Sequence, residues 1–299
     1  MTSPGKTVTS PGKPARDRVM VTPEVLREEL AGPDAPVLLD VRWALGDPDG
    51  HAHHLAGHLP GAVFVDLETE LAGPVGPRTG RHPLPTPQAL QACARRWGIR
   101  SGGRVVVHDA TGGTAAARAW WLLRWGGLAD VRLLDGGLAG WVDAGGALRT
   151  GPVPDPEPGD VELSGHRMPV LDADGAAELA RDGLLLDARA GARYRGEVEP
   201  VDPRAGHVPG AVSAPTTDNL DTDGAFLPPD ALSERFGALG AAGSRAVGVY
   251  CGSGVTAAHE IAALASIGVD AALYAGSWSA WSADPDRPLA TGPLPGGTS

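Results

Sequence analysis

The sequence contains only two cysteines, Cys93 and Cys251, among its 299 residues. Two cysteines cannot build the disulfide framework of a small secreted domain, so stability must come from apolar cores, which a chain of this length can bury. No apolar run approaches the ~20 residues that a membrane-spanning helix needs. Residues 1–18 carry Thr-Ser-Pro-Gly-Lys twice and lack the apolar stretch of a signal peptide. We therefore expect a soluble, cytoplasmic protein whose thiols stay reduced.

Basic charge is also scarce, because the formal net charge is −11. Nucleic acids and anionic membranes are bound by basic surfaces, so we expect neither as a partner. His51, His53 and His54 lie close together in the sequence, but no matching set of metal ligands accompanies them, and a solvated loop is the favoured interpretation. We expect no metal and no cofactor.

The chain contains an internal duplication. Four blocks of similar sequence occur twice, in the same order and at a nearly constant offset: 38–42 and 185–189, 56–63 and 205–212, 105–109 and 247–251, 133–141 and 273–281. The period is far longer than that of a solenoid repeat. The duplication therefore indicates two related domains.

Each half alternates short apolar runs with helical patterns. The runs typical of buried parallel strands are 37–41, 105–108, 131–134, 184–187, 246–250 and 271–274. The helical patterns are 23–30, 87–97, 115–125, 172–181, 229–239 and 257–267. This alternation predicts an α/β protein with two tandem domains, each a mainly parallel sheet covered by helices on both faces.

Proline and glycine mark the expected domain limits. The predicted order is a disordered tail, a first domain, a proline-rich linker, a second domain and a C-terminal tail: 1–18, 19–150, 151–170, 171–290 and 291–299. Ligands of open parallel sheets bind at the carboxyl ends of the strands. Cys251 follows one of these ends, which makes it the first candidate for a functional residue.

The loop CGSGVT that begins at Cys251 has the features of a nucleophile loop. A strand precedes it and a helix follows, so backbone N–H groups and a helix N-terminus stabilise thiolate over thiol. Gly252 and Gly254 let the backbone curl around the sulfur. The first copy has Asp109 at this position, and Cys93 lies on a predicted helix, where we expect a small core residue. A structural cysteine is the alternative, but the glycine-rich loop favours a nucleophile.

The repeated blocks resemble the tandem-domain rhodanese family of sulfurtransferases, from about residue 19 to residue 289. The resemblance implies an inactive first domain, a catalytic second domain and a persulfide intermediate on Cys251. It implies a small-molecule sulfur donor, and as acceptor either cyanide or a thiol, on a small molecule or on a thioredoxin-like protein. The loop is similar to that of 3-mercaptopyruvate sulfurtransferases, whereas thiosulfate-preferring members typically carry basic residues after the cysteine.

Persulfide chemistry needs groups that stabilise anions around two sulfur atoms. We expect backbone N–H groups to supply them, from four residues that follow Cys251: Gly252, Gly254, Val255 and Thr256. The loop itself contains no cation. This favours 3-mercaptopyruvate, which needs one carboxylate clamp, over the dianion thiosulfate.

Arg193 is the expected carboxylate clamp, because its segment resembles the family segment whose arginine reaches the substrate. A planar guanidinium matches a carboxylate with two hydrogen bonds. Arg195 is a weaker candidate, and Arg189 is expected to pair with the acid of its own Asp-x-Arg motif. A second family arginine, nine residues beyond the first, is replaced by Asp202, and Arg204 is one residue that could take over its part.

The resemblance also suggests a Ser–His–Asp relay beside the cysteine, which would consist of Ser253, His58 and Asp47. Such a relay could deliver a proton to the departing enolate. His207 occupies the position of His58 in the other half, so the histidine of this motif could equally cap a turn. Both interpretations stay open.

Three other functions are alternatives to this one, and the sequence disfavours the first of them. A cysteine phosphatase of similar fold needs an arginine six residues after its cysteine, and Ala257 stands there. A thiosulfate sulfurtransferase and a module that only relays persulfide remain alternatives. Mercaptopyruvate sulfurtransferase is the favoured function.

Overall fold

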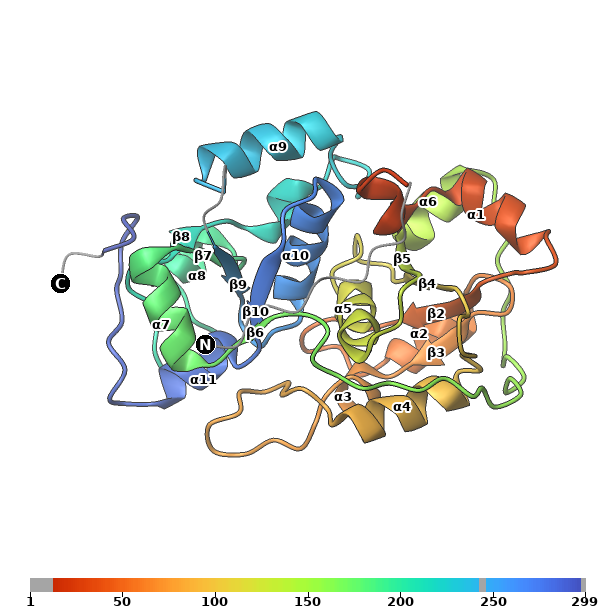
Figure 1. Cartoon of the computed structure of the whole chain (residues 1–299), viewed down its shortest axis with the longest axis horizontal. Helices are drawn as coiled ribbons and strands as arrows, with labels where there is room; N and C mark the ends of the chain where they lie inside the picture. The colour runs from red at the N-terminus through yellow and green to blue at the C-terminus, as the bar shows by residue number, and fades with distance from the viewer. Residues whose placement is uncertain (1–12, 242–245, 297–299) are drawn as a thin grey trace. The chain divides into compact units, whose positions relative to one another are not determined.

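The computed structural model describes residues 13–241 and 246–296 and divides the chain into two compact units (Figure 1). The first unit runs up to Ala72 and adds Pro85–Met168 and Leu220–Phe226. The second contains Gly73–Leu84 and Pro169–Asn219, and continues from Leu227. Each half of the chain thus lends a short stretch to the other unit. We call Gly73–Leu84 the crossing segment.

The first unit contains a five-stranded parallel sheet with the order β1-β5-β4-β2-β3. Its strands are β1 (Met20–Val21), β2 (Val37–Val41), β3 (Val63–Val65), β4 (Val105–His108) and β5 (Val131–Leu134). Its helices are η1 (Arg16–Arg18), α1 (Pro23–Leu30), α2 (Gly50–Ala56), α3 (Leu67–Glu70), α4 (Pro87–Arg96), α5 (Ala116–Gly126) and α6 (Gly137–Asp143).

The second unit repeats this topology, with the strand order β6-β10-β9-β7-β8. Its strands are β6 (Val170–Leu171), β7 (Leu184–Asp187), β8 (Val212–Ser213), β9 (Val247–Tyr250) and β10 (Ala271–Tyr274). Its helices are α7 (Ala173–Asp182), α8 (Gly191–Tyr194), η2 (Thr216–Asn219), α9 (Pro229–Ala238), α10 (Thr256–Ser266) and α11 (Ser277–Ala283). The identical order of strands confirms the α/β fold class and the duplication.

Local sequence explains where the helices begin and which of them are buried. Thr22 and Thr86 cap α1 and α4, and a proline follows each cap at the first helical position. The helices that follow β4 and β9, α5 and α10, are apolar on nearly every face, so they are buried along almost their whole length. Figure 1 shows α10 running beside β9 and β10.

The structure describes residues at both ends of the expected first domain. Residues 1–12 of the expected tail lie outside the described residues, but Arg16 already belongs to the first unit, where Nη2 lies 2.7 Å from Asp135 Oδ2. The expected linker packs on the same unit: Val161 and Leu163 are buried, and Val161 N donates to Ile99 O at 3.2 Å. Apolar side chains inside the proline-rich stretch explain why it does not run free of the domain.

Candidate active site

Cys251 directly follows β9, the central strand of the second sheet, and its side chain is buried. Its backbone N–H donates to Ser277 Oγ at 3.1 Å, and Gly254 N–H donates to Cys251 Sγ at 3.2 Å. Helix α10 begins at Thr256, so its N-terminus faces the loop that holds the sulfur. The Gly254 N–H and the N-terminus of α10 therefore direct positive partial charge toward the sulfur.

Gly254 is required by the shape of this loop. Its φ is +82°, and a Cβ there would lie 2.6 Å from Ala275 O. Any other residue would therefore have to move the loop that closes around the sulfur.

The corresponding loop of the first unit shows what such a turn binds. Asp109 follows β4, is buried, and its two carboxylate oxygens accept from four backbone N–H groups: Thr111 and Gly113 at 2.8 Å, Ala115 at 2.8 Å and Ala116 at 3.0 Å. This turn is therefore an anion cradle that is filled by a carboxylate of its own chain. The second unit holds a thiol at the same point of the sheet.

Arg193, at the end of α8, lies beside the Cys251 loop. A Cβ on Gly252 would lie 3.4 Å from Arg193 Nη1. Two buried carboxylates hold this guanidinium: Nη2 is 2.6 Å from Glu199 Oε1 and 3.2 Å from Asp202 Oδ2. Burial opposes the ionisation of Glu199, but the hydrogen bond and charge of Arg193, together with the backbone N–H groups of Val201 and Asp202, keep the pKa of Glu199 below its ordinary value.

The crossing segment adds two residues to the same loop. His82 is buried, and its Nδ1 is hydrogen bonded to Ser253 Oγ at 2.7 Å. Arg81 is paired with Asp202, and its Nη2 lies 3.2 Å from the position that a Cβ on Gly252 would take. Sequence reasoning missed both residues, because this stretch has no periodicity and belongs by sequence to the other half.

The remaining arginines of this region hold the backbone. Arg189 is buried, with Nη2 at 2.6 Å from Asp187 Oδ2 and 2.6 Å from Gly206 O. Arg204 donates to carbonyl groups around the end of α11, and exposed Arg195 pairs with Glu197. The expected pairing of Arg189 is confirmed, and Arg204 is committed to a structural contact.

Each residue of the expected relay has a hydrogen-bond partner within its own unit. Asp47 Oδ2 lies 3.0 Å from His53 Nε2, and His58 Nδ1 donates to His54 O at 2.8 Å. His207 makes the same kind of contact in the second unit, with Nδ1 at 2.8 Å from Tyr194 O. The shared contact supports a structural role for this histidine of the motif, while Ser253 has His82 as its partner.

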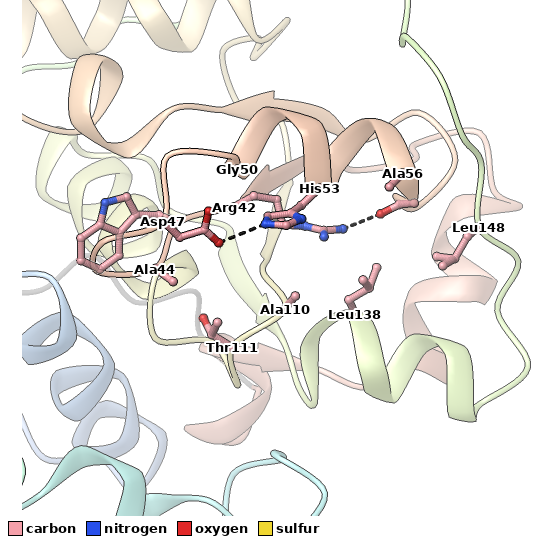
Figure 2. A pocket seen from close by; sticks show the side chains of 12 residues that line it. Arg42, Ala44, Asp47, Gly50, His53, Ala56, Ala110, Thr111, Leu138 and Leu148 are labelled. Carbon is pink, nitrogen blue, oxygen red and sulfur yellow. Dashed lines mark hydrogen bonds and ion pairs between the residues drawn. The ribbon is translucent and has the colours of Figure 1, made fainter.

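The first unit retains a cavity of about 410 Å³ at the carboxyl ends of its strands (Figure 2). Figure 2 shows Asp47 and His53 pointing toward one another on its wall, with Thr111 of the Asp109 loop nearby. Arg42 lines the cavity but is tied to Asp40 at 2.6 Å. This cavity therefore lies where open parallel sheets bind ligands, but no cysteine is among the described residues that line it.

Cys93 lies on α4 and is buried, and this burial raises the pKa of its thiol, although Arg96 donates to the sulfur. It is suited to packing and not to nucleophilic attack. Across residues 13–241 and 246–296, no cluster of histidine, cysteine and acidic side chains is arranged to hold a metal ion. The same residues form no helix of the length and apolarity that crossing a membrane requires.

Comparisons with known proteins show the family of this chain. The rhodanese-like domain matches the chain twice, over residues 22–144 and 172–284, and the chain belongs to the rhodanese family. A probable 3-mercaptopyruvate sulfurtransferase of Pseudomonas aeruginosa is 50% identical over 281 residues, which cover 91% of this chain and 98% of the relative. A putative thiosulfate sulfurtransferase of Mycobacterium tuberculosis is 48% identical over 285 residues, covering 93% and 99%.

A solved structure shows the same fold. The crystal structure of a 3-mercaptopyruvate sulfurtransferase from Escherichia coli superposes with a TM-score of 0.76 at 33% identity, covering 87% of this chain and 98% of that one. The named relatives are transferases of sulfur.

Proposed function

We propose that this protein is a sulfurtransferase that takes sulfur from 3-mercaptopyruvate through a persulfide on Cys251. The observation that carries the proposal is the pair of equivalent loops. In the first unit the loop binds an anion, the Asp109 carboxylate, and in the second a thiol stands in its place. The second domain is then the catalytic one, and the first lacks a nucleophile at this position.

In the first half-reaction, the Cys251 thiolate attacks the sulfur of the donor. The bond between that sulfur and carbon breaks, and its electron pair stays on carbon as the enolate of pyruvate. Cys251 becomes a persulfide, whose charge the N–H groups of Gly252, Gly254, Val255 and Thr256 are placed to stabilise. In the second half-reaction, a thiolate or cyanide attacks the outer sulfur and restores the Cys251 thiolate.

Two further groups have roles in the first half-reaction. Arg193 holds the donor carboxylate, because its guanidinium lies beside Gly252. Ser253 and His82, joined at 2.7 Å, hold the proton that the enolate takes up. Ser253 of the expected relay therefore retains its role in this proposal. Its partner is His82, and His58 and Asp47 have no part in it.

Thiosulfate is the second candidate donor, favoured by one specific observation. The loop contains no cation of its own, but two guanidinium groups, those of Arg193 and Arg81, lie beside Gly252. They would suit a dianion better than a single clamp would. The name of the Mycobacterium tuberculosis relative points the same way for that protein.

Steady-state assays with both donors, each with cyanide, a small thiol and a reduced thioredoxin-like protein, test the proposal. We expect kcat/KM for 3-mercaptopyruvate to exceed that for thiosulfate. A preference for thiosulfate would establish the second candidate. Activity with neither donor would leave a module that accepts persulfide from a partner. We further propose a cytoplasmic location, because a reactive thiol needs a reducing compartment.

A further inference from the structure

We propose that Arg81, held in place by Asp202, binds the anionic group of the sulfur donor together with Arg193. The chemistry it recognises is an oxyanion next to the reacting sulfur, either the carboxylate of a mercapto acid or the oxygens of thiosulfate. This inference rests on the proposed function, because it places a donor beside Cys251. It assigns a specificity-determining role to the crossing segment.

The two guanidinium groups converge on one residue. A Cβ on Gly252 would lie 3.2 Å from Arg81 Nη2 and 3.4 Å from Arg193 Nη1. Gly252 directly follows the nucleophile Cys251. Because Gly252 has no side chain, no Cβ crowds these two cations. An oxyanion bound by both guanidinium groups would therefore lie next to the residue that follows the nucleophile.

A buried carboxylate keeps the two like charges together. Asp202 is paired with Arg81 through Oδ1 and lies 3.2 Å from Arg193 Nη2 through Oδ2. Burial raises the pKa of Asp202 despite both arginines, which indicates a poorly hydrated setting. In such a setting the attraction between guanidinium and oxyanion is screened less than in water.

Arg81 has unused capacity to donate. Its Nε is buried and has no hydrogen-bond partner among the residues that the structure describes. A buried donor left without an acceptor costs about 1–3 kcal/mol. The side chain of Arg81 is nevertheless 29% exposed and that of Arg193 is 17% exposed, so a small anion can reach the pair from solvent.

The crossing segment holds Arg81 firmly. Arg81 N donates to Ser279 Oγ at 3.1 Å, and the neighbouring His82 is bonded to Ser253. Gly80 has φ +76°, and a Cβ there would lie 2.5 Å from Gly276 O, so the backbone packs against the start of α11 without space for a side chain. An arginine anchored on both sides loses little conformational entropy when an anion binds.

Alkylation of Cys251 measures this anion site without any sulfur transfer. Iodoacetate carries a carboxylate next to its reactive carbon, whereas iodoacetamide is neutral. The rate for each reagent is measured on the peptide that contains Cys251, and their ratio reports the attraction of the anion. We expect Arg81→Met to lower the iodoacetate-to-iodoacetamide ratio by roughly three- to tenfold, as expected for loss of a charge-assisted contact shared with a carboxylate.

Arg81→Lys should recover part of the ratio, because it keeps the charge and loses the planar fork. The matched control is Arg78→Met, three residues earlier on the same segment and exposed. It removes the same charge from the chain and should leave the ratio within twofold of the original. An unchanged ratio in Arg81→Met, or an equal loss in Arg78→Met, would overturn the proposal. A protein that transfers no sulfur would still give a valid ratio, so the two failures are distinguishable.

Steady-state kinetics of Arg81→Met then identify the source of the oxyanion. A higher KM for 3-mercaptopyruvate identifies the carboxylate, and a higher KM for thiosulfate identifies its oxygens. A KM unchanged for both donors would remove Arg81 from donor binding. Unfolding curves of each variant confirm that the comparison is made on folded protein.

Discussion

The Asp109 loop and the Cys251 loop have the same place in their sheets and opposite contents. Each follows a central strand and precedes a buried helix. In one, four backbone N–H groups are used by a carboxylate of the chain itself, and in the other a donor of the loop faces a sulfur. The fold therefore supplies the same kind of loop in both halves. Under the proposed function, the side chain at this one position decides whether the loop is closed by a carboxylate or carries a nucleophile.

The helices that follow the two loops also differ, at one buried position. The ninth residue after Asp109 is Arg118, and the ninth after Cys251 is Glu260. Both are buried: Arg118 donates to Leu71 O, and Glu260 accepts from Asn219 Nδ2 at 2.7 Å. The two units have the same framework and different buried charges. Substitutions at equivalent positions should therefore differ in their effects on turnover and on the free energy of unfolding.

The largest expected effect is at Cys251. Cys251→Ser should abolish sulfur transfer with every donor, because a hydroxyl group cannot form a persulfide. Cys93→Ser is the control and should retain activity, since Cys93 is a buried residue of α4. The measurement is turnover with 3-mercaptopyruvate and with thiosulfate. Transfer that survives in Cys251→Ser would place the nucleophile elsewhere.

The next largest effect is at Arg193. Arg193→Met should raise the KM for the donor about tenfold or more, because a charge-assisted contact worth about 1.5–3 kcal/mol is lost. Arg195→Ala is the matched control: this arginine, two residues away, pairs with exposed Glu197 and should leave KM unchanged. The KM for the acceptor should change less than that for the donor. A donor KM equal in both variants would remove Arg193 from the site.

Asp109 should matter for stability and not for turnover. Asp109→Asn replaces one of the two acceptor oxygens by a donor group that faces backbone N–H groups, so the free energy of unfolding should fall by about 2–4 kcal/mol. Urea unfolding measures this loss. Turnover of the folded variant should stay within about threefold of the original, as for a residue that closes a silent site. A loss of turnover as complete as in Cys251→Ser would contradict the inequality of the two halves.

The smallest expected effect is at Glu260, on the way the free energy of unfolding depends on pH. Burial raises the pKa of Glu260 to about 7 from an ordinary 4.5, although Arg235 opposes the shift. Between these values the folded state holds a proton that the unfolded state releases, so the free energy of unfolding falls as pH rises from about 4.5 to 7. Glu260→Gln should remove up to about 3 kcal/mol of this decrease. Urea unfolding at pH 5 and pH 8 tests it, and an unaltered difference between the two pH values would exclude Glu260 as the source.

Much of the fold was predictable because buried parallel strands leave a local record. The expected runs at 37–41, 105–108 and 184–187 coincide with β2, β4 and β7. The outer strands β1, β3, β6 and β8 were missed, since they have only two or three residues, too few to show a period.

The candidate site was predictable only where it is local. The Cys251 loop could be recognised because the cysteine, the glycines and the helix start are consecutive in sequence. Arg81 and His82 could not, because a segment without secondary structure brings them to that loop through tertiary contacts. In the sequence, Asp202 occupies the position where the family has a second arginine. The structure shows that its carboxylate pairs with Arg81. Its role depends on a residue that lies far away in the sequence.

Mass spectrometry after treatment with 3-mercaptopyruvate tests the central claim most directly. The protein is incubated with the donor in the absence of an acceptor, digested and mapped peptide by peptide. We predict a gain of one sulfur atom on the peptide that contains Cys251 and its loss when cyanide is added. A gained sulfur on the Cys93 peptide, or no adduct with either donor, would contradict the account.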